Sequence, residues 1–430
     1  MSGSGQTSAR RAGEAIIRTL VQAGHAAYFA GGCVRDELLG LTPTDYDVAT
    51  DATPDRISSL FPRTSEVGAA FGVVLVKSGR EVTEVATFRS EGTYSDRRRP
   101  DSVTFSNPAE DAKRRDYTVN ALFLDPHAGG AGSVEGALVT SHGSHGRVID
   151  FVGGLLDLER RVLRAVGDPD QRLAEDHLRA LRAARLAAKL GFQIDPGTAQ
   201  AIRKHASQLQ GVSRERIGEE IRRMAEHPSR ATAAALVESL GLEGPVFDES
   251  GASQTGPRTW TTLGSLPPEV AFPTAIAAWA LDLGLDPTDR GQREALVRGW
   301  RLALMLSNED RDLLGAVLAA LPDIEHGWHG MTMAKRKRLA AASWFGEALV
   351  LARAYRPARA AAVAQDVAEL AKTRGGLWPA PLLTGDDLVA AGLSPGPGFK
   401  RLLDQVLDAQ LEGKIETKAQ ALELALRLGV

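Results

Sequence analysis

The chain changes character near residue 155, and this change limits the folds that it can adopt. Before that point, short runs rich in Val and Thr are bounded by turn residues, as in GVVLVKSG at residues 72–79 and VTEVATFR at residues 82–89, a pattern typical of strands. After it, Leu, Ala and Arg dominate at helical spacing, as in EDHLRALRAARLAAKL at residues 175–190. We therefore expect an α+β chain, with a mixed α/β head over residues 13–154 followed by an all-α remainder.

The remainder is expected to contain more than one part, because the chain has 430 residues and single cores rarely grow beyond about 250–300. Residues 245–270 are poor in periodicity and rich in Pro, Gly, Ser and Thr, which predicts a linker or long loop. We divide the remainder into a neck (155–227), a body (228–375) and a tail (376–430). Residues 1–12, MSGSGQTSARRA, lack an apolar signal core and are expected to be a disordered leader.

The composition is that of an ordinary globular protein, with 43% hydrophobic and 24% charged residues. The net charge is −3, so nucleic-acid binding would have to come from a local basic surface. Cys33 is the only cysteine, which excludes a disulfide within the chain, argues against a cysteine-based zinc site and fits the reducing cytoplasm. No apolar run reaches about 18 residues, so we expect no membrane-spanning helix.

Two aspartates, Asp45 and Asp47, are separated by one residue in a predicted strand over residues 45–50. Residues i and i+2 of a strand point to the same side, so both carboxylates would face one point. Two hard oxygen ligands suit Mg²⁺, which keeps waters and takes further ligands from substrate phosphates. Glu84, in a neighbouring predicted strand, is a possible third ligand. Taken alone, the pair also fits a polar strand face without a metal.

Gly31 and Gly32 end a predicted strand shortly before the aspartates, and glycine lets the backbone approach a ligand closely. The helical turn that follows would expose N–H groups that attract phosphate, and Arg35 can bind phosphate oxygens in a bidentate manner. Asp36 is expected to cap or pair locally. A phosphate cradle followed by a metal pair is what transfer of a nucleotide needs. The sequence contains no G-x-x-x-x-G-K-[ST] motif and so does not support a P-loop ATPase.

Five motifs occur in a fixed order. They are GG-x-VRD and D-x-D within residues 31–47, RRD-x-T-x-NAL at 114–122, ED-x-x-R-x-x-R-x-x-R at 175–185 and S-x-ERI-x-x-E at 213–220. Together they resemble the class II tRNA nucleotidyltransferase and bacterial poly(A) polymerase family, a branch of the polymerase β-like nucleotidyltransferases. The resemblance implies a small nucleotidyltransferase head with a mixed sheet, followed by an elongated all-α neck, body and tail.

The resemblance also implies a role for each matching position. Asp45 and Asp47 match the ligands of a two-metal Mg²⁺ site. The positions that match nucleotide-binding residues are Gly32 and Arg35 for the triphosphate, Arg115, Asp116 and Asn120 in the RRD motif, and Asp176, Arg179, Arg182 and Arg185 in the ED motif. Asp176 and Arg179 match the pair that reads the base edge, and the implied partners are CTP, ATP and tRNA.

The residues of the ED motif have a chemical logic of their own. Asp176, Arg179, Arg182 and Arg185 repeat every three residues and would form one stripe on a helix. One interpretation is an ion-pair ladder on a solvated face. The other is base recognition, because cytosine and adenine both present an amino donor beside a ring-nitrogen acceptor. Guanine and uracil present a carbonyl and a ring N–H instead, so an Asp–Arg pair would select C and A without a template.

The implied activity is addition of CCA to tRNA 3′ ends, by in-line transfer with release of pyrophosphate. An A-adding enzyme and a poly(A) polymerase share these motifs and stay open as alternatives. An inactive RNA-binding module is a further alternative, against which the intact site residues argue. In the family, a loop at residues 88–100 helps the switch from C to A addition; here FRSEGTYSDRRRP looks complete, which argues against an enzyme that stops at CC.

Three segments outside the main motifs also carry predictions. Residues 127–146, rich in Gly, Ser and His, are expected to be a surface insertion or a hairpin extension. Glu215 and Arg216 are expected to brace a neighbouring helix through charge-assisted bonds. In the tail, Lys400 and Arg401 could bind an RNA phosphate, although a plain helical hairpin fits equally well.

Overall fold

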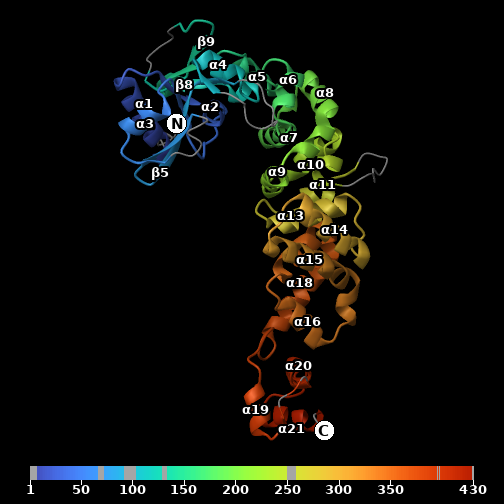
Figure 1. Ribbon diagram of the computed structural model, residues 1–430. Helices are drawn as coiled ribbons and strands as arrows, with labels where there is room; N and C mark the ends of the chain where they lie inside the picture. Colours follow the sequence, from blue (N-terminus) through green and yellow to red (C-terminus); the bar gives the residue numbers. More distant parts are fainter. Residues whose placement is uncertain are drawn as a thin grey trace. The chain divides into compact units, whose positions relative to one another are not determined.

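The structure is a computed structural model that describes residues 7–65, 72–91, 103–127, 133–248, 258–394, 396 and 398–428 (Figure 1). Contacts divide the chain into two compact units. The first comprises residues 1–217 and 236–249, and the second comprises residues 218–235 and 250–430. The finer division into head, neck, body and tail stays a prediction.

Eight strands of the first unit form one sheet in the order β3-β4-β5-β2-β1-β8-β10-β9. The pair β2 and β5 is parallel, and the other neighbouring pairs of this sheet are antiparallel. The bounds are Ala27–Ala30 (β1), Val48–Thr50 (β2), Thr64–Ser65 (β3), Val73–Ser78 (β4), Glu81–Thr87 (β5), Phe123–Asp125 (β8), Leu138–Ser141 (β9) and Arg147–Asp150 (β10). The mixed sheet confirms the predicted class of the head. Strands β6 (Arg89–Glu91) and β7 (Val103–Phe105) form a separate pair.

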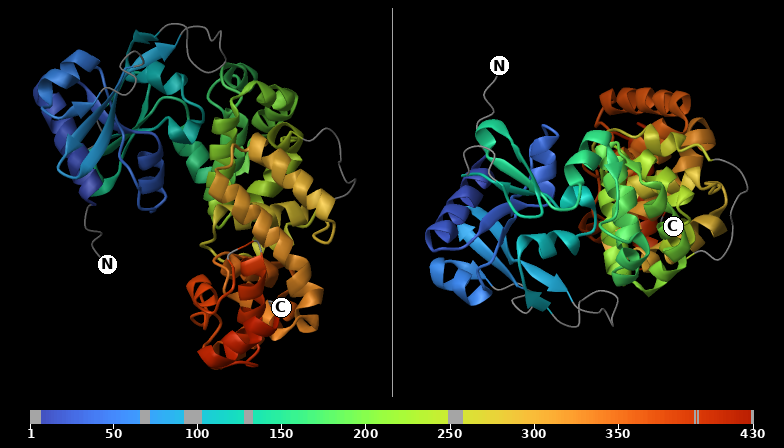
Figure 2. Two further views of the ribbon diagram at one scale, coloured as in Figure 1. Left: turned by 60° about the horizontal axis from the view of Figure 1, so that its bottom comes forward. Right: turned by 90° about the horizontal axis from the view of Figure 1, so that it is seen from above.

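Helices pack against the sheet and against the separate strand pair (Figure 2). Helix α1 (Ser8–Gln22) packs on β1, β2 and β5, and α3 (Pro54–Leu60) packs on β4 and β5. Helix α2 (Gly32–Leu38) follows β1 directly, and α4 (Pro108–Lys113) packs on β6. The antiparallel pair β9 and β10 forms a hairpin at one edge of the sheet, so the described part of residues 127–146 is the predicted hairpin extension.

The first helix begins earlier than predicted. The hydroxyl oxygen of Thr7 caps it by accepting from the N–H of Arg10 at 3.2 Å, and Arg10 is 3% exposed. Residues 8–12 are therefore helical, and the predicted disordered leader is wrong for them. The physical reason is that Arg10 has two carboxylate partners, Glu14 and Glu37, which offset the cost of burying a cation. Residues 1–6 lie outside the described part of the chain.

Helices continue the first unit after the sheet. Their bounds are Gly154–Arg160 (α5), Pro169–Glu175 (α6), Arg179–Leu190 (α7), Pro196–His205 (α8), Arg214–Glu226 (α9), Arg230–Ser239 (α10) and Glu243–Phe247 (α11), with α9 and α10 extending into the second unit. Two short strands, β11 (Val162–Leu163) and β12 (Gln193–Ile194), pair in parallel. The single helix predicted over residues 175–185 is wrong, because the chain leaves the helical conformation between α6 and α7.

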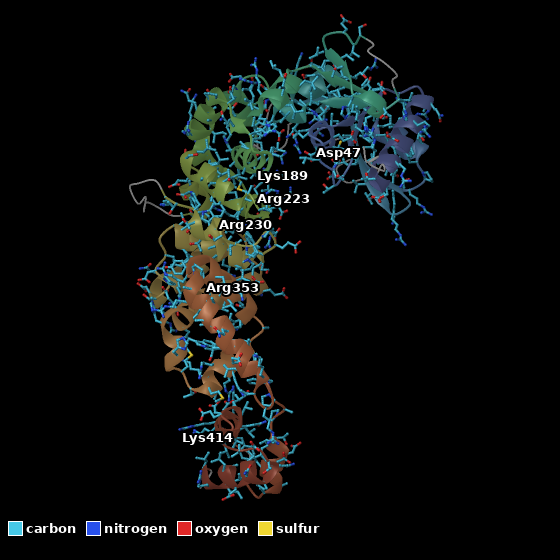
Figure 3. The ribbon with its side chains drawn as sticks, turned by 180° about the vertical axis from the view of Figure 1, so that it is seen from behind. Asp47, Lys189, Arg223, Arg230, Arg353 and Lys414 are labelled. Atoms are coloured by element: carbon cyan, nitrogen blue, oxygen red, sulfur yellow. The ribbon has the colours of Figure 1, made fainter. Side chains whose placement is uncertain are left out.

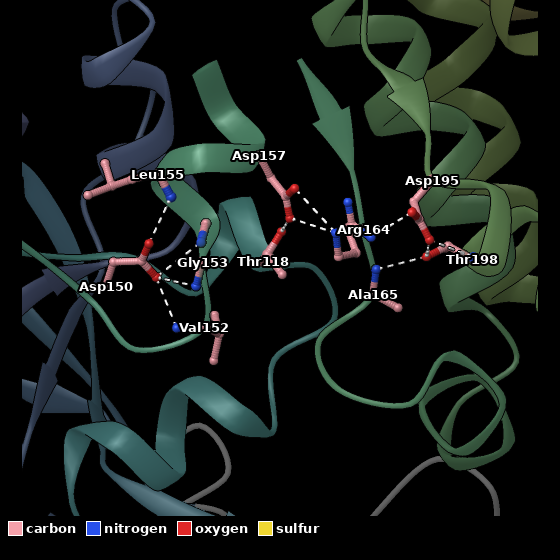
Figure 4. A network of polar contacts seen from close by, with 11 residues as sticks. Thr118, Asp150, Val152, Gly153, Leu155, Asp157, Arg164, Ala165, Asp195 and Thr198 are labelled. Carbon is pink, nitrogen blue, oxygen red and sulfur yellow. Dashed lines mark hydrogen bonds and ion pairs between the residues drawn. The ribbon is translucent and has the colours of Figure 1, made fainter. Parts of the chain in front are cut away.

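A network of polar contacts joins the sheet to these helices (Figure 4). Asp150, at the end of β10, accepts four backbone N–H groups of residues 152–155 at 2.9–3.0 Å and so satisfies the start of α5. Arg164 binds Asp157 of α5 at 3.1 Å and Asp195 at 2.6 Å. One guanidinium therefore ties α5 to the residue that caps α8.

The described part of the second unit is all helical apart from its connecting segments. Its remaining helices are Thr261–Gly264 (α12), Phe272–Asp282 (α13), Arg290–Ala303 (α14), Asn308–Pro322 (α15), Met333–Ala340 (α16), Phe345–Tyr355 (α17), Pro357–Lys372 (α18), Gly385–Ala390 (α19), Gly398–Leu411 (α20) and Lys418–Leu428 (α21). Trp279, Trp300 and Trp328 are its largest buried side chains. The last three helices share an apolar cluster that includes Leu388, Leu402 and Ala421. Within the described ranges, no helix has the length and apolar character needed to cross a membrane.

Arg230, at the start of α10, is buried and donates hydrogen bonds to backbone carbonyls (labelled in Figure 3). It donates to the carbonyl oxygens of Ala225 at 2.7 Å, Pro267 at 3.0 Å and Pro268 at 2.6 Å, and burial lowers its pKa. Arg230→Ala would leave these acceptors without a donor. We expect it to lower the free energy of unfolding of the second unit by about 2–4 kcal/mol.

Urea denaturation followed by tryptophan fluorescence measures this loss, because all six tryptophans lie between residues 260 and 378. Arg223→Ala is the matched control, since the Arg223 side chain is 54% exposed and pairs with Glu219 at the surface. Its effect should stay below about 0.5 kcal/mol. Equal effects of the two substitutions would contradict the role given to Arg230.

Candidate active site

Asp45 and Asp47 lie in the backbone directly before β2, not inside a strand over residues 45–50 as predicted, because the regular pairing of β2 begins at Val48. The N–H of Ala30 in β1 still donates to the carbonyl of Asp47 at 3.0 Å. The chain therefore stays extended before β2, and its side chains continue to alternate between the two faces. Both aspartates are exposed, whereas Tyr46 and Val48 are 5% and 1% exposed. The two carboxylates therefore share the solvent side of the chain, as predicted.

Glu84 lies next to Asp47 across the sheet. The parallel register of β2 and β5 pairs Val48 with Val85, so Asp47 and Glu84, one residue earlier on each chain, are also neighbours. Strands lie about 4.8 Å apart, and side chains at matching positions point to the same face. Glu84 is exposed while Val85 is buried, which confirms that Glu84 shares the face of the two aspartates.

The charges of this cluster act on one another. The surrounding protein partly desolvates the Asp47 carboxylate, although its side chain keeps access to solvent, and the negative charges of Glu84 and Asp45 add to this effect. Together they raise the pKa of Asp47 to about 7, against a smaller opposing influence of Arg115. A carboxyl group that repels its neighbours in this way is stabilised as an anion by an added cation.

The donor set fits Mg²⁺ on its chemistry, since the carboxylates of Asp45, Asp47 and Glu84 are hard oxygen ligands on one face. Among the residues described, no three His, Cys, Asp or Glu side chains form a ready-made metal cage. An ion held by these carboxylates would thus need waters or substrate phosphates to complete its shell, which is the usual way in which Mg²⁺ binds.

The glycine turn lies between two arginines. Gly31 has φ +81°, and a Cβ atom there would lie 2.9 Å from Nη1 of Arg115, so only glycine fits this approach without strain. Arg35 is buried, binds Asp36 at 2.6 Å and donates to Oδ1 of Asn120 at 2.5 Å. The local pairing of Asp36 is therefore confirmed, whereas the binding of a triphosphate by Gly32 and Arg35 stays a prediction.

Arg115 connects the glycine turn to the carboxylates. It donates to the carbonyl oxygen of Asn120 at 3.1 Å and binds Asp111 at 3.0 Å, and its charge opposes the upward pKa shift of Asp47. Its Cζ atom lies 5.1 Å from the ring centroid of Phe123, within the range of a cation–π contact. The sequence prediction that placed Arg115 in the site is consistent with this position.

Asp111 is a site residue that the sequence analysis missed. It is 1% exposed and binds both Arg114 and Arg115. Burial alone would raise the pKa of Asp111, but the two guanidinium charges lower it. The signal was available, because Asp111 precedes the two arginines by three and four residues, the spacing at which side chains of a helix meet.

Asp116 joins the sheet region to α7. Its Oδ2 accepts from Nε and Nη2 of Arg182 at 3.0 and 2.7 Å, and its Oδ1 accepts from the amide of Asn120 at 3.1 Å and from the N–H of Tyr117 at 2.8 Å. Burial would raise the pKa of Asp116, but Arg182, Asn120 and the charge of Arg179 lower it to about 2. The RRD motif and the ED motif therefore meet in one ion pair.

The predicted helical stripe does not include both Asp176 and Arg179, because Asp176 follows α6 and Arg179 begins α7. Asp176 ends α6 with φ −150° and ψ 104°, and its Oδ1 accepts from the N–H of Leu178 at 3.1 Å. A short carboxylate that binds the nearby backbone competes with the helix and ends it. Arg179 begins α7 and binds Glu175 at 2.5 Å, while Arg185 is half-buried further along α7. Base reading and nucleotide binding by these residues stay predictions.

Arg216 of α9 binds the second oxygen of Asp176 at 2.6 Å. This ion pair confirms the predicted bracing role of the S-x-ERI-x-x-E motif for Arg216. The loop residues Arg97, Arg98, Arg99 and Pro100, which were interpreted as part of the switch from C to A addition, lie outside the described residues.

The fold and the site define a nucleotidyltransferase with a polymerase-type head. Residues 27–164 match the family model described as the poly A polymerase head domain, and residues 191–249 match the one described as the probable RNA and SrmB-binding site of polymerase A.

Curated relatives and solved structures give the narrower assignment. The chain is 34% identical to a CCA-adding enzyme of Limosilactobacillus fermentum over 422 residues. The aligned region covers 95% of this chain and 94% of that protein. It is 33% identical over 415 residues to a CCA-adding enzyme of Geobacillus thermodenitrificans, covering 94% and 93%. The solved Bacillus stearothermophilus CCA-adding enzyme in complex with CTP is similar at TM-score 0.77 and 29% identity, over 98% of both chains. The chain belongs to the CCA-adding enzyme family.

The ion pair between Asp116 and Arg182 should show a measurable coupling energy. We expect a double-mutant cycle of Asp116→Asn and Arg182→Gln to give about 1–2 kcal/mol, since the Asp116 side chain is only 12% exposed, whereas that of Arg182 is 35% exposed and partly screened by solvent. Amide hydrogen exchange of residues 117–120 measures the local opening. The exposed pair Glu219 and Arg223 serves as control, with less than about 0.5 kcal/mol; an equally small value for the first pair would refute the coupling.

Proposed function

We propose that this protein adds CCA to the 3′ ends of tRNA from CTP and ATP, without a template and with release of pyrophosphate. The observation that carries the proposal is the shared face of Asp45, Asp47 and Glu84 beside the glycine turn, in a chain that is similar to CCA-adding enzymes over nearly its full length. We place the reaction in the cytoplasm, where the single buried thiol of Cys33 would stay reduced.

In the proposed mechanism, Asp45 and Asp47 hold Mg²⁺, with Glu84 as a third ligand. When bound, two such ions would lower the pKa of the RNA 3′-hydroxyl and neutralise the triphosphate during in-line attack on the α-phosphorus. Gly32 and Arg35 hold the triphosphate by backbone N–H groups and a guanidinium. Arg115 lies between the carboxylates and the glycine turn, and it adds positive charge near the phosphates, where negative charge develops during transfer.

Base selection is proposed for Asp176 and Arg179. An incoming cytosine or adenine would offer its amino group to Asp176 and its ring nitrogen to Arg179. Both side chains are held near the start of α7, by Arg216 and Glu175 respectively, so they are pre-oriented before a base binds. Arg182 and Arg185 continue along α7 and would bind the nucleotide further from its edge.

Two other enzymatic functions fit the same motifs, namely an A-adding tRNA nucleotidyltransferase and a poly(A) polymerase. The similarity to CCA-adding enzymes over at least 94% of this chain favours CCA addition. An inactive RNA-binding module is disfavoured because the carboxylates keep the geometry and the electrostatics of a cation site.

The proposal is tested with three tRNAs that end before CCA, after C and after CC, each offered labelled CTP or ATP. We expect CTP use on the first two and ATP use on the third. ATP use on the CC-ending tRNA alone would indicate A-addition, and long A tails on unrelated RNA would indicate a poly(A) polymerase. The double variant Asp45→Ala/Asp47→Ala should lower the rate of nucleotide incorporation by at least about a thousandfold and leave tRNA binding intact. Retained activity would overturn the metal assignment.

The pH dependence of the reaction should report on Asp47. Its raised pKa means that the group is neutral below and anionic above pH of about 7, so at limiting Mg²⁺ the rate should rise as the pH passes through neutrality. Glu84→Gln removes one of the charges that raise this pKa, and the midpoint should move to lower pH. Initial rates across neutral pH measure the midpoint. Glu81→Gln, on the same strand, should leave it unchanged, and an unmoved midpoint in Glu84→Gln would refute the proposed coupling.

A further inference from the structure

Tyr46 lies between the two aspartates, yet it points into the head instead of toward solvent. It is 5% exposed, and its ring meets that of Phe29 edge to face, with 5.0 Å between centroids. Its hydroxyl donates to Oε1 of Glu37 at 2.5 Å. The residue that separates the two proposed metal ligands is therefore fixed at both its ring and its hydroxyl group.

Glu37 stands near the end of α2, the helix that begins at the glycine turn and carries Arg35. The same oxygen that accepts from Tyr46 also binds Nη1 of Arg10. The Glu37 side chain is 9% exposed, and its Oε2 has no hydrogen-bond partner in the described part of the chain. The carboxylate is thus positioned by two donors on one oxygen, one from α1 and one from the loop that carries the aspartates.

Arg10 holds Glu37 from the other side. It also binds Glu14 at 2.8 Å and donates to the carbonyl oxygen of His145 at 3.0 Å. A cavity of about 270 Å³ borders Arg10, Glu37 and Tyr46. The ring of Tyr46 is held by Phe29 on its other side, so beside this cavity the hydrogen bond to Glu37 is what fixes its hydroxyl end.

The loop that carries the aspartates has few other anchors. Residues 39–47 join α2 to β2, and in this segment Pro43 and Tyr46 are buried while Asp45 and Asp47 are exposed. Pro43 is two and four residues away from the aspartates, whereas Tyr46 adjoins both. The N–H of Ala30 also donates to the carbonyl of Asp47 at 3.0 Å, so β1 holds the backbone at one end of the loop, and Tyr46 is the side chain that joins the loop to α2.

We propose that Tyr46 and Glu37 are positioning residues for nucleotidyl transfer, whose hydrogen bond fixes the carboxylate loop to α2 and so sets the spacing between the metal-binding aspartates and the phosphate-binding turn. This inference rests on the proposed function, because in-line transfer is the step that needs the spacing. Neither residue touches the substrate in this role. A misplacement of about 1 Å can reduce the rate of such a step about a hundredfold.

Tyr46→Phe removes only the hydroxyl and keeps the ring against Phe29, and Glu37→Gln weakens the same contact from the other side. The first measurement needs neither metal nor nucleotide: amide hydrogen exchange in the full chain should become at least about tenfold faster in residues 39–47 of both variants and stay unchanged in β10. The second is a steady-state assay, in which kcat should fall about tenfold or more with KM for CTP changed less than about threefold, while the Mg²⁺ concentration for half-maximal rate rises. The double variant should resemble the single ones, because both remove one interaction.

Tyr28→Phe is the matched control, since it deletes a hydroxyl from a half-buried tyrosine of β1 in the same sheet and should leave exchange and kcat unchanged. Unaltered exchange in residues 39–47 of Tyr46→Phe, or a lower kcat with unchanged Mg²⁺ dependence and additive effects, would overturn the inference. Faster exchange throughout the sheet would also overturn it, because that marks a general loss of stability. If the unmodified protein adds no nucleotide to tRNA, the proposed function fails, while the exchange experiment still tests the anchoring of the loop.

Discussion

The ion pair between Asp116 and Arg182 is the interaction on which the arrangement of the site depends. The Asp116 side chain is mostly shielded from solvent, and both of its oxygens are used, one by Arg182 of α7 and the other by Asn120. Asn120 in turn accepts from Arg35 of α2, so one continuous chain of polar contacts runs from the glycine turn to α7. Since a buried charge without a partner is costly, each member of this chain restricts the position of the next.

The site contains charges of two kinds. Arg35, Arg115 and Arg182 each bind a carboxylate of their own, namely Asp36, Asp111 and Asp116. By contrast, partial desolvation of Asp47 and the negative charges of Glu84 and Asp45 together raise the pKa of Asp47 to about 7. The arginines are thus held in place by their pairs, whereas the carboxylates gain most from a divalent cation.

The residues of the site were predictable from the sequence where a short-range rule applied. The two aspartates share a face because an extended chain alternates its side chains, even though the regular strand starts only at Val48. The helix over residues 175–185 was predicted wrongly because periodicity does not show whether the side chain of Asp176 bonds to the nearby backbone. The leader was predicted wrongly for residues 8–12 for a different reason, since the partner of Arg10 on α2 is 27 residues away, and such tertiary pairing cannot be read from a local pattern.

The ion pairs of Asp176 and Arg179 bear on base selection under the proposed function. A base that binds this pair must replace, at least in part, the contacts with Arg216 and Glu175. Cytosine and adenine return a donor to Asp176 and an acceptor to Arg179, so little free energy is lost. Guanine and uracil return neither, and they would leave both charges unsatisfied in a half-buried place. The protein partners therefore do more than orient the two side chains: they increase the difference in binding free energy between the bases that fit and those that do not.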